Sequence, residues 1–177
     1  MKDNTEKYNR FFKRTVNHIH RVQNNMLYLV TNHLNPLELS MDDATNLMHN
    51  VMNHDRSKFS INQFKPYVEI TEYHYQKAQG TEHKYTDDIQ KIVDKAINEH
   101  YLVENHHPQR LENSLSTMNK YELIEVICDL QAMANEFNKD SCRDYFIQTW
   151  VVKHKKYFKD FNTVYMFMIK VIECFES

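Results

Sequence analysis

The chain has 177 residues, of which 41% are hydrophobic and 26% are charged, so it is long enough to bury a substantial core. Its formal net charge of −2 lacks the strongly basic character that nucleic-acid binders and proteins of anionic membrane surfaces usually carry. A single glycine, Gly80, excludes the glycine-rich phosphate loops of classical ATPases and dinucleotide-binding enzymes.

Apolar residues recur at helical spacing from the start of the chain. The first predicted helix covers about residues 6 to 34, because the position before Pro36 is disfavoured in a helix. At about 100° per residue, His18 lies on the flank of the apolar face and His20 lies nearer the polar side, which favours His18 as the inward residue. The predicted apolar face comprises Phe11, Phe12, Val16, Ile19, Val22, Met26 and Val30.

The second predicted helix begins after Ser40, which is a suitable N-cap with Asp43 as its partner in a capping box. The apolar stripe of this helix leads directly into the doublet His54-Asp55, with Lys58 three residues further on. The stripe itself consists of Ala44, Leu47, Met48, Val51 and Met52.

A short helix and a polar loop centred on Gly80 are predicted next, followed by a long helix whose apolar stripe His100 continues. Pro108 breaks the chain after that helix, and another helix covers about residues 119 to 138. Two further helices are predicted around residues 142–152 and 163–175. Together these elements predict one all-α domain over residues 1–177, with about six or more helices.

The three cysteines, Cys128, Cys142 and Cys174, are widely spaced and lack a CxxC motif, so we expect buried free thiols. No apolar segment approaches the roughly 20 residues that a membrane span needs, and the N-terminus lacks the apolar core of a signal peptide. We therefore expect a cytoplasmic protein that binds neither a membrane nor a nucleic-acid duplex. A homo-oligomer is left open.

Several polar side chains lie on the apolar sides of the predicted helices, where an unpaired carboxylate or imidazole is costly. His54 and Asp55 end one stripe, His100 lies within another, and Asp129 lies on the 119–138 helix with Glu125 one turn before it. Histidine, aspartate and glutamate are the usual ligands of divalent transition metals. The pattern therefore predicts a metal site.

These residues resemble the H…HD…D pattern of the HD-domain superfamily of metal-dependent phosphohydrolases. The matching segments are HIHRV (18–22), NHDRSK (53–58) and the later Asp129. The segments HDRSKFSINQFKPY, AINEHYLVENHHP and MNKYELIEVICDLQAMA are also similar to a small uncharacterised HD-like family of bacteria and their viruses. The likeness covers roughly residues 15 to 137. Glu104 departs from it, standing where the pattern has Asn, and Leu130 replaces its Trp.

The resemblance implies an HD-like fold in which one metal is bound by His18, His54, Asp55 and Asp129. It also implies a second metal, which Asp55 bridges and which His100 binds together with His106 or His107. The metal would be Mn, Fe, Co, Ni or Zn, and a metal-activated water would attack a small phosphate ester such as a nucleotide or a cyclic nucleotide. Lys58 would then steady a phosphate oxygen or the developing charge.

Glu125, one turn from Asp129, would orient a ligand or act as a base. Other interpretations of the same residues stay open. The doublet His54-Asp55 can be a helix end without metal, His100 a hydrogen-bonded core histidine, and Lys58 a solvated cation. Two further functions are also open: a di-iron oxygenase of the HD type, and a helical domain that binds a metal or a nucleotide without catalysis.

Overall fold

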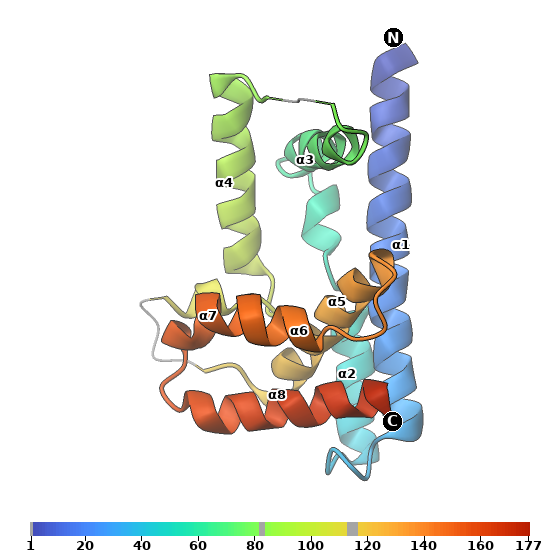
Figure 1. Ribbon diagram of the computed structural model, residues 1–177, viewed down its shortest axis with the longest axis vertical. Helices are drawn as coiled ribbons and strands as arrows, with labels where there is room; N and C mark the ends of the chain where they lie inside the picture. The colour runs from blue at the N-terminus through green and yellow to red at the C-terminus, as the bar shows by residue number, and fades with distance from the viewer. Residues whose placement is uncertain (1, 82–83, 113–116) are drawn as a thin grey trace. The chain divides into compact units, whose positions relative to one another are not determined.

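The structure, a computed structural model, describes residues 2–81, 84–112 and 117–177 (Figure 1). Every regular element in these ranges is helical, which confirms the predicted all-α class. The chain divides into two compact units. The first unit comprises Met1–Asn17 and Asp55–Glu104, and the second comprises His18–His54 and Asn105–Ser177. The prediction of one domain over the whole chain stays a prediction.

The first unit is held together by aromatic rings and by ion pairs between helices. Phe11 is fully buried, and its ring lies 5.2 Å from that of Phe64 and 5.6 Å from that of Phe59. Arg10 donates two hydrogen bonds to the carboxylate of Glu72, at 2.8 and 2.7 Å. The helical segments of this unit are the beginning of α1 (Lys2–Asn32), η1 (Arg56–Phe59), α3 (Phe64–Ala78) and α4 (Asp87–Val103).

The second unit is built around α5, which is buried along almost its whole length and contacts α2 and α8. Its side chains Ile124 and Ile127 are fully buried, and burial of one such side chain contributes about 1.5–3 kcal/mol. The elements of this unit are the remainder of α1, α2 (Met41–Val51), η2 (Pro108–Leu111), α5 (Lys120–Glu136), α6 (Arg143–Tyr145), the π-helix η3 (Phe146–Trp150), α7 (Val151–His154), η4 (Lys155–Tyr157) and α8 (Phe161–Glu176).

Local capping explains where the two helices that flank the future site begin. Ser40 caps α2 in a capping box with Asp43, as the sequence predicts, and Asn119 caps α5 in a second box with Glu122. Asp43 also accepts a hydrogen bond from the hydroxyl of Tyr121 at 2.5 Å, so the beginnings of α2 and α5 are joined.

The predicted apolar face of the first helix is too broad. Phe12 and Val16 are exposed by 45% and 37%, whereas Phe11, Val22 and Met26 are fully buried. The buried positions follow the 3.6-residue period closely along a line through Phe11, and residues 12 and 16 lie about 100° and 140° away from Phe11 around the helix. The same line includes position 18, so His18 is buried and His20 is exposed, as predicted.

The remaining expectations differ mainly in length. The helix predicted as short before Gly80 is α3, with 15 residues. The helix predicted at residues 142–152 contains a π-helical segment and is continued by η4 to Tyr157. All three cysteines are buried free thiols. In the described part of the chain, no helix combines the length and the apolar character that crossing a membrane would require.

Candidate metal centre

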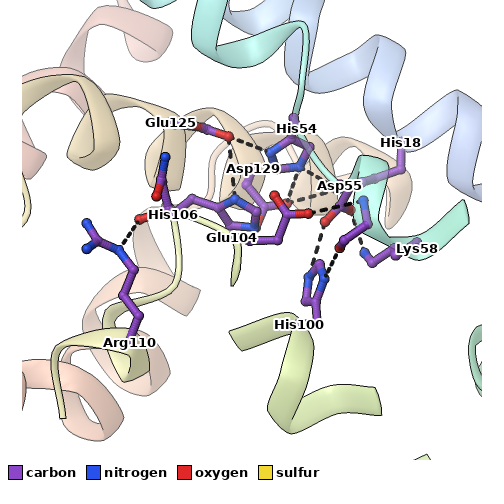
Figure 2. Close-up of polar contacts among 12 residues, drawn as sticks. His18, His54, Asp55, Lys58, His100, Glu104, His106, Arg110, Glu125 and Asp129 are labelled. Atoms are coloured by element: carbon purple, nitrogen blue, oxygen red, sulfur yellow. Dashed lines mark hydrogen bonds and ion pairs between the residues drawn. The ribbon is translucent and has the colours of Figure 1, made fainter. Parts of the chain in front are cut away.

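Five of the predicted site residues come together in the second unit, and we call them the histidine–carboxylate cluster (Figure 2). Each is delivered by a different turn of the fold: α1, the turn after α2, the segment before η2, and two successive turns of α5. The members are His18, His54, His106, Glu125 and Asp129.

His54 is the centre of this cluster and is 1% exposed. Its Nδ1 lies 2.9 Å from Oε1 of Glu125, and because a carboxylate only accepts, Nδ1 carries the proton. The lone pair is then on Nε2, which lies 3.4 Å from Nε2 of His18 and 3.9 Å from Oδ1 of Asp129. Glu125 thereby selects the tautomer of His54 that can bind a metal.

His18 and Asp129 complete the arrangement around Nε2 of His54. Nε2 of His18 lies 3.0 Å from Oδ1 of Asp129, and the Asp129 side chain is 21% exposed. Asp129 and Glu125 are four residues apart on α5, so their carboxylates share one face of the helix. Glu125 therefore orients the His54 imidazole, and Asp129 places a carboxylate oxygen beside the Nε2 atoms of His18 and His54.

Both carboxylates of the cluster are ionised. Burial opposes ionisation of Glu125, but hydrogen bonds from His106 and His54 outweigh it and lower its pKa to about 2. Burial likewise opposes ionisation of Asp129, and the hydrogen bond from His18 brings its pKa well below the usual range. The negative charges of the buried Glu125 and the partly exposed Asp129 favour positive charge beside them, and a divalent cation would supply it.

Burial and contacts differ between His106 and His107, and the choice of ligand between them stays a prediction. His106 is 3% exposed, with Nδ1 3.4 Å from Oε1 of Glu125 and its ring 4.4 Å from that of His54. His107 lies beside it, with the two ring centroids 4.2 Å apart, and is less buried. Donor atoms of His54, His106 and Glu125 all lie within 4.8 Å of one another, so this group could hold a metal.

The predicted residues Asp55, Lys58 and His100 lie in the first unit, because that unit includes the segment Asp55–Glu104. Asp55 accepts a hydrogen bond from the ammonium of Lys58, and its Oδ1 lies 3.2 Å from Nε2 of His100 (Figure 2). Its φ of 59° is left-handed, a conformation that aspartate tolerates better than most residues. The Lys58 ammonium also lies 5.2 Å from the centre of the Tyr67 ring.

Two further residues contact this group, and the sequence reasoning assigned a role to neither. The Ser57 hydroxyl lies 2.9 Å from Nδ1 of His100, and the Ser57 amide donates to Oε1 of Glu104 at 3.3 Å. We call Asp55, Ser57, Lys58, His100 and Glu104 the Asp55 cluster. Donor atoms of three of them, Asp55, His100 and Glu104, lie within 4.8 Å of one another and could also hold a metal.

One signal in the sequence could have drawn attention to Glu104: it follows His100 by four residues, which is one helical turn. Ser57 carried no comparable signal, because its contacts with His100 and Glu104 span 43 and 47 positions of the chain.

Comparison with known proteins gives a family but no function. Residues 7–171 match the model of a family of unknown function, DUF5662. No curated protein and no solved structure shows a significant match to the chain.

Proposed function

Because the chain belongs to DUF5662, a family of unknown function, we propose its activity from the chemistry of its own side chains. We propose that it is a metal-dependent phosphohydrolase acting on a small phosphate ester, such as a nucleotide or a cyclic nucleotide. The resemblance to HD-domain phosphohydrolases motivates the reaction, and the histidine–carboxylate cluster supports the metal.

The observation that carries the proposal is the convergence of three ligand atoms. Nε2 of His18, Nε2 of His54 and Oδ1 of Asp129 are separated pairwise by 3.0, 3.4 and 3.9 Å. Nitrogen and oxygen ligands lie about 2.0–2.2 Å from a transition metal, so donors around one ion are about 3–3.5 Å apart. The three atoms therefore need little rearrangement to share a cation.

Within the proposed reaction, the residues of the cluster bind and orient. His18, His54 and Asp129 would hold the metal, which when bound lowers the pKa of a water ligand and polarises a phosphate oxygen. Glu125 keeps His54 in its metal-binding tautomer, since its Oε1 accepts from Nδ1 of that ring. Of the two roles predicted for Glu125, its contacts support the orienting one.

The predictions that Asp55 binds the same metal and that Lys58 holds a phosphate oxygen stay predictions. Lys58 has the chemistry for its part, because an ammonium has three N–H donors. One of them serves the carboxylate of Asp55. The Lys58 side chain is 18% exposed.

The proposal is tested by assaying phosphate release from nucleoside monophosphates, and ring opening of cyclic nucleotides, with Mn²⁺ or Co²⁺ present. His18→Ala should lower turnover by about 100-fold or more, because a ligand is lost. His20→Ala is the matched control, since His20 is exposed on the same helix, and it should behave as wild type. Equal turnover by the His18→Ala and His20→Ala proteins would overturn the proposal.

Two alternatives are separated by the same preparation. Three imidazoles in one cluster also suit iron, so a di-iron oxygenase predicts about two irons per chain and consumption of oxygen. A non-catalytic metal- or nucleotide-binding domain predicts full metal uptake with no turnover of any ester in the panel.

A further inference from the structure

The Asp55 cluster contains a group of donors that differs from the ligand set implied by the family resemblance. We propose that Asp55, His100 and Glu104 form a cation site within the first unit, with Ser57 as the residue that orients His100. Glu104 is the new ligand, and it brings a second carboxylate to the group. The proposal concerns metal binding alone and does not depend on the reaction proposed above.

The donor atoms of the proposed site lie close together, and two of the three side chains are buried. Asp55 and His100 are 1% and 3% exposed, and donor atoms of these two and of Glu104 all lie within 4.8 Å of one another. His100 lies in the last turn of α4, and Glu104 caps the C-terminal end of that helix. The carbonyl groups at a helix C-terminus favour a nearby cation. The helix therefore delivers two ligands to a place that already favours positive charge.

The proposed site carries more negative than positive charge. Asp55 and Glu104 bring two carboxylates, and the ammonium of Lys58 is paired with one of them through Oδ2 of Asp55. Oδ1 of the same carboxylate faces Nε2 of His100 at 3.2 Å. A carboxylate has two oxygens with several lone pairs, so Asp55 can keep Lys58 on one oxygen and bind a cation with the other. Glu104 can likewise accept from the Ser57 amide and still bind.

Ser57 orients the ring of His100. Its hydroxyl lies 2.9 Å from Nδ1, so Nδ1–H can donate to the hydroxyl and leave the lone pair of His100 on Nε2, toward Asp55. Metal-binding histidines typically donate their other N–H to such a partner. Ser57 is a positioning residue, and the amide of the same residue is held by Glu104 at 3.3 Å.

Two carboxylates with one imidazole suit a divalent first-row cation of the Mn²⁺ type. Mn²⁺ is therefore the probe, and the free ion is followed by electron paramagnetic resonance in the absence of substrate. Binding is measured in the His18→Ala protein, which weakens the other cluster and leaves the Asp55 cluster intact. We expect one saturable Mn²⁺ site per chain in this protein.

Adding Glu104→Gln should weaken Mn²⁺ binding by at least about tenfold, because a charged ligand becomes a neutral amide. Adding Glu99→Gln is the matched control: Glu99 precedes His100 on α4 and pairs with Lys95 at 3.7 Å, so Mn²⁺ binding should not change. Glu104→Asn, which removes the charge and also shortens the side chain, should weaken binding as Glu104→Gln does. Helical content by circular dichroism checks that each variant is folded.

Ser57→Ala should weaken Mn²⁺ binding by about 10–100-fold, and Ser57→Thr, which keeps the hydroxyl, should restore it. The inference is overturned if Glu104→Gln and Glu99→Gln bind Mn²⁺ equally well, or if His18→Ala shows no saturable site. Either result leaves the proposed phosphohydrolase activity to its own test, because no substrate is present.

Discussion

The histidine–carboxylate cluster and the Asp55 cluster balance their negative charge in different ways. In the first, Glu125 and Asp129 face imidazoles, whose charge depends on protonation. In the second, Asp55 also faces the ammonium of Lys58. The first cluster therefore depends on an added proton or cation for its positive charge, whereas the second holds part of its counter-charge within the chain. Loss of metal should therefore affect the two clusters unequally.

Replacing the central imidazole should have the largest effect. His54→Ala removes a metal ligand and leaves Oε1 of Glu125 without its 2.9 Å donor, so metal affinity at this cluster should fall by about 100-fold or more. The unfolding free energy should also fall by about 1–3 kcal/mol, because the buried carboxylate of Glu125 loses a hydrogen-bond donor. Metal titration and thermal denaturation check both parts. An unchanged metal affinity would show that His54 is not a metal ligand.

Glu125→Gln should have the next largest effect, because it keeps the shape of the side chain and removes its charge. The amide can no longer enforce the Nδ1–H tautomer of His54, so metal affinity should fall by about 10–100-fold. Glu136→Gln, near the end of the same helix α5, is the control and should leave metal affinity unchanged. Isothermal titration with Co²⁺ measures each affinity, and equal values for the two variants would remove Glu125 from the site.

Lys58→Met should act in the opposite direction at the Asp55 cluster. Without the ammonium, the carboxylate of Asp55 loses a competing cation, and metal binding there should tighten by about threefold to tenfold. The metal affinity of the histidine–carboxylate cluster should not change, so the two clusters should respond differently to the same substitution. Mn²⁺ titration of the wild-type and Lys58→Met proteins makes the comparison. Weaker binding in the variant would show that Lys58 supports the cation rather than competing with it.

Asp43 provides the smallest effect and a reference carboxylate outside both clusters. Hydrogen bonds from Lys120, Tyr121 and Ser40 lower its pKa below the ordinary value of 3.8. Its stabilising contribution is therefore present above about pH 4 and is lost as the pH falls below that value. Thermal denaturation from about pH 2 to about pH 7 should show that the melting temperature of Asp43→Asn falls less steeply with decreasing pH than that of the wild-type protein. Added metal should not change this difference.

Much of the fold could be predicted from local patterns. The capping box of Ser40 and Asp43 is visible in four residues of sequence, and helical geometry alone separates the inward His18 from the outward His20. The same geometry places Glu125 and Asp129 on one face of α5. Such features are local, because a helix repeats within a few residues, and one sequence is enough to find them.

The parts that could not be predicted depend on contacts between distant segments. Whether His106 or His107 lies against Glu125 is decided by the packing of the segment before η2 on α5, which no periodicity describes. Ser57 meets His100 across 43 positions of the chain, so its hydroxyl looked like an ordinary polar group. Phe12 is exposed although it belongs to the apolar stripe, because the width of a stripe does not determine how much of it neighbouring elements cover.

The most direct test of the metal centre is the metal content of the purified wild-type protein, without an affinity tag or added metal, measured by mass spectrometry. We predict at least about one equivalent of Mn, Fe, Co, Ni or Zn per chain, with about one equivalent lost in the His54→Ala protein. If the wild-type protein contains none of these metals and takes up none on reconstitution, the histidine–carboxylate cluster is a set of internal hydrogen bonds, and the account is contradicted.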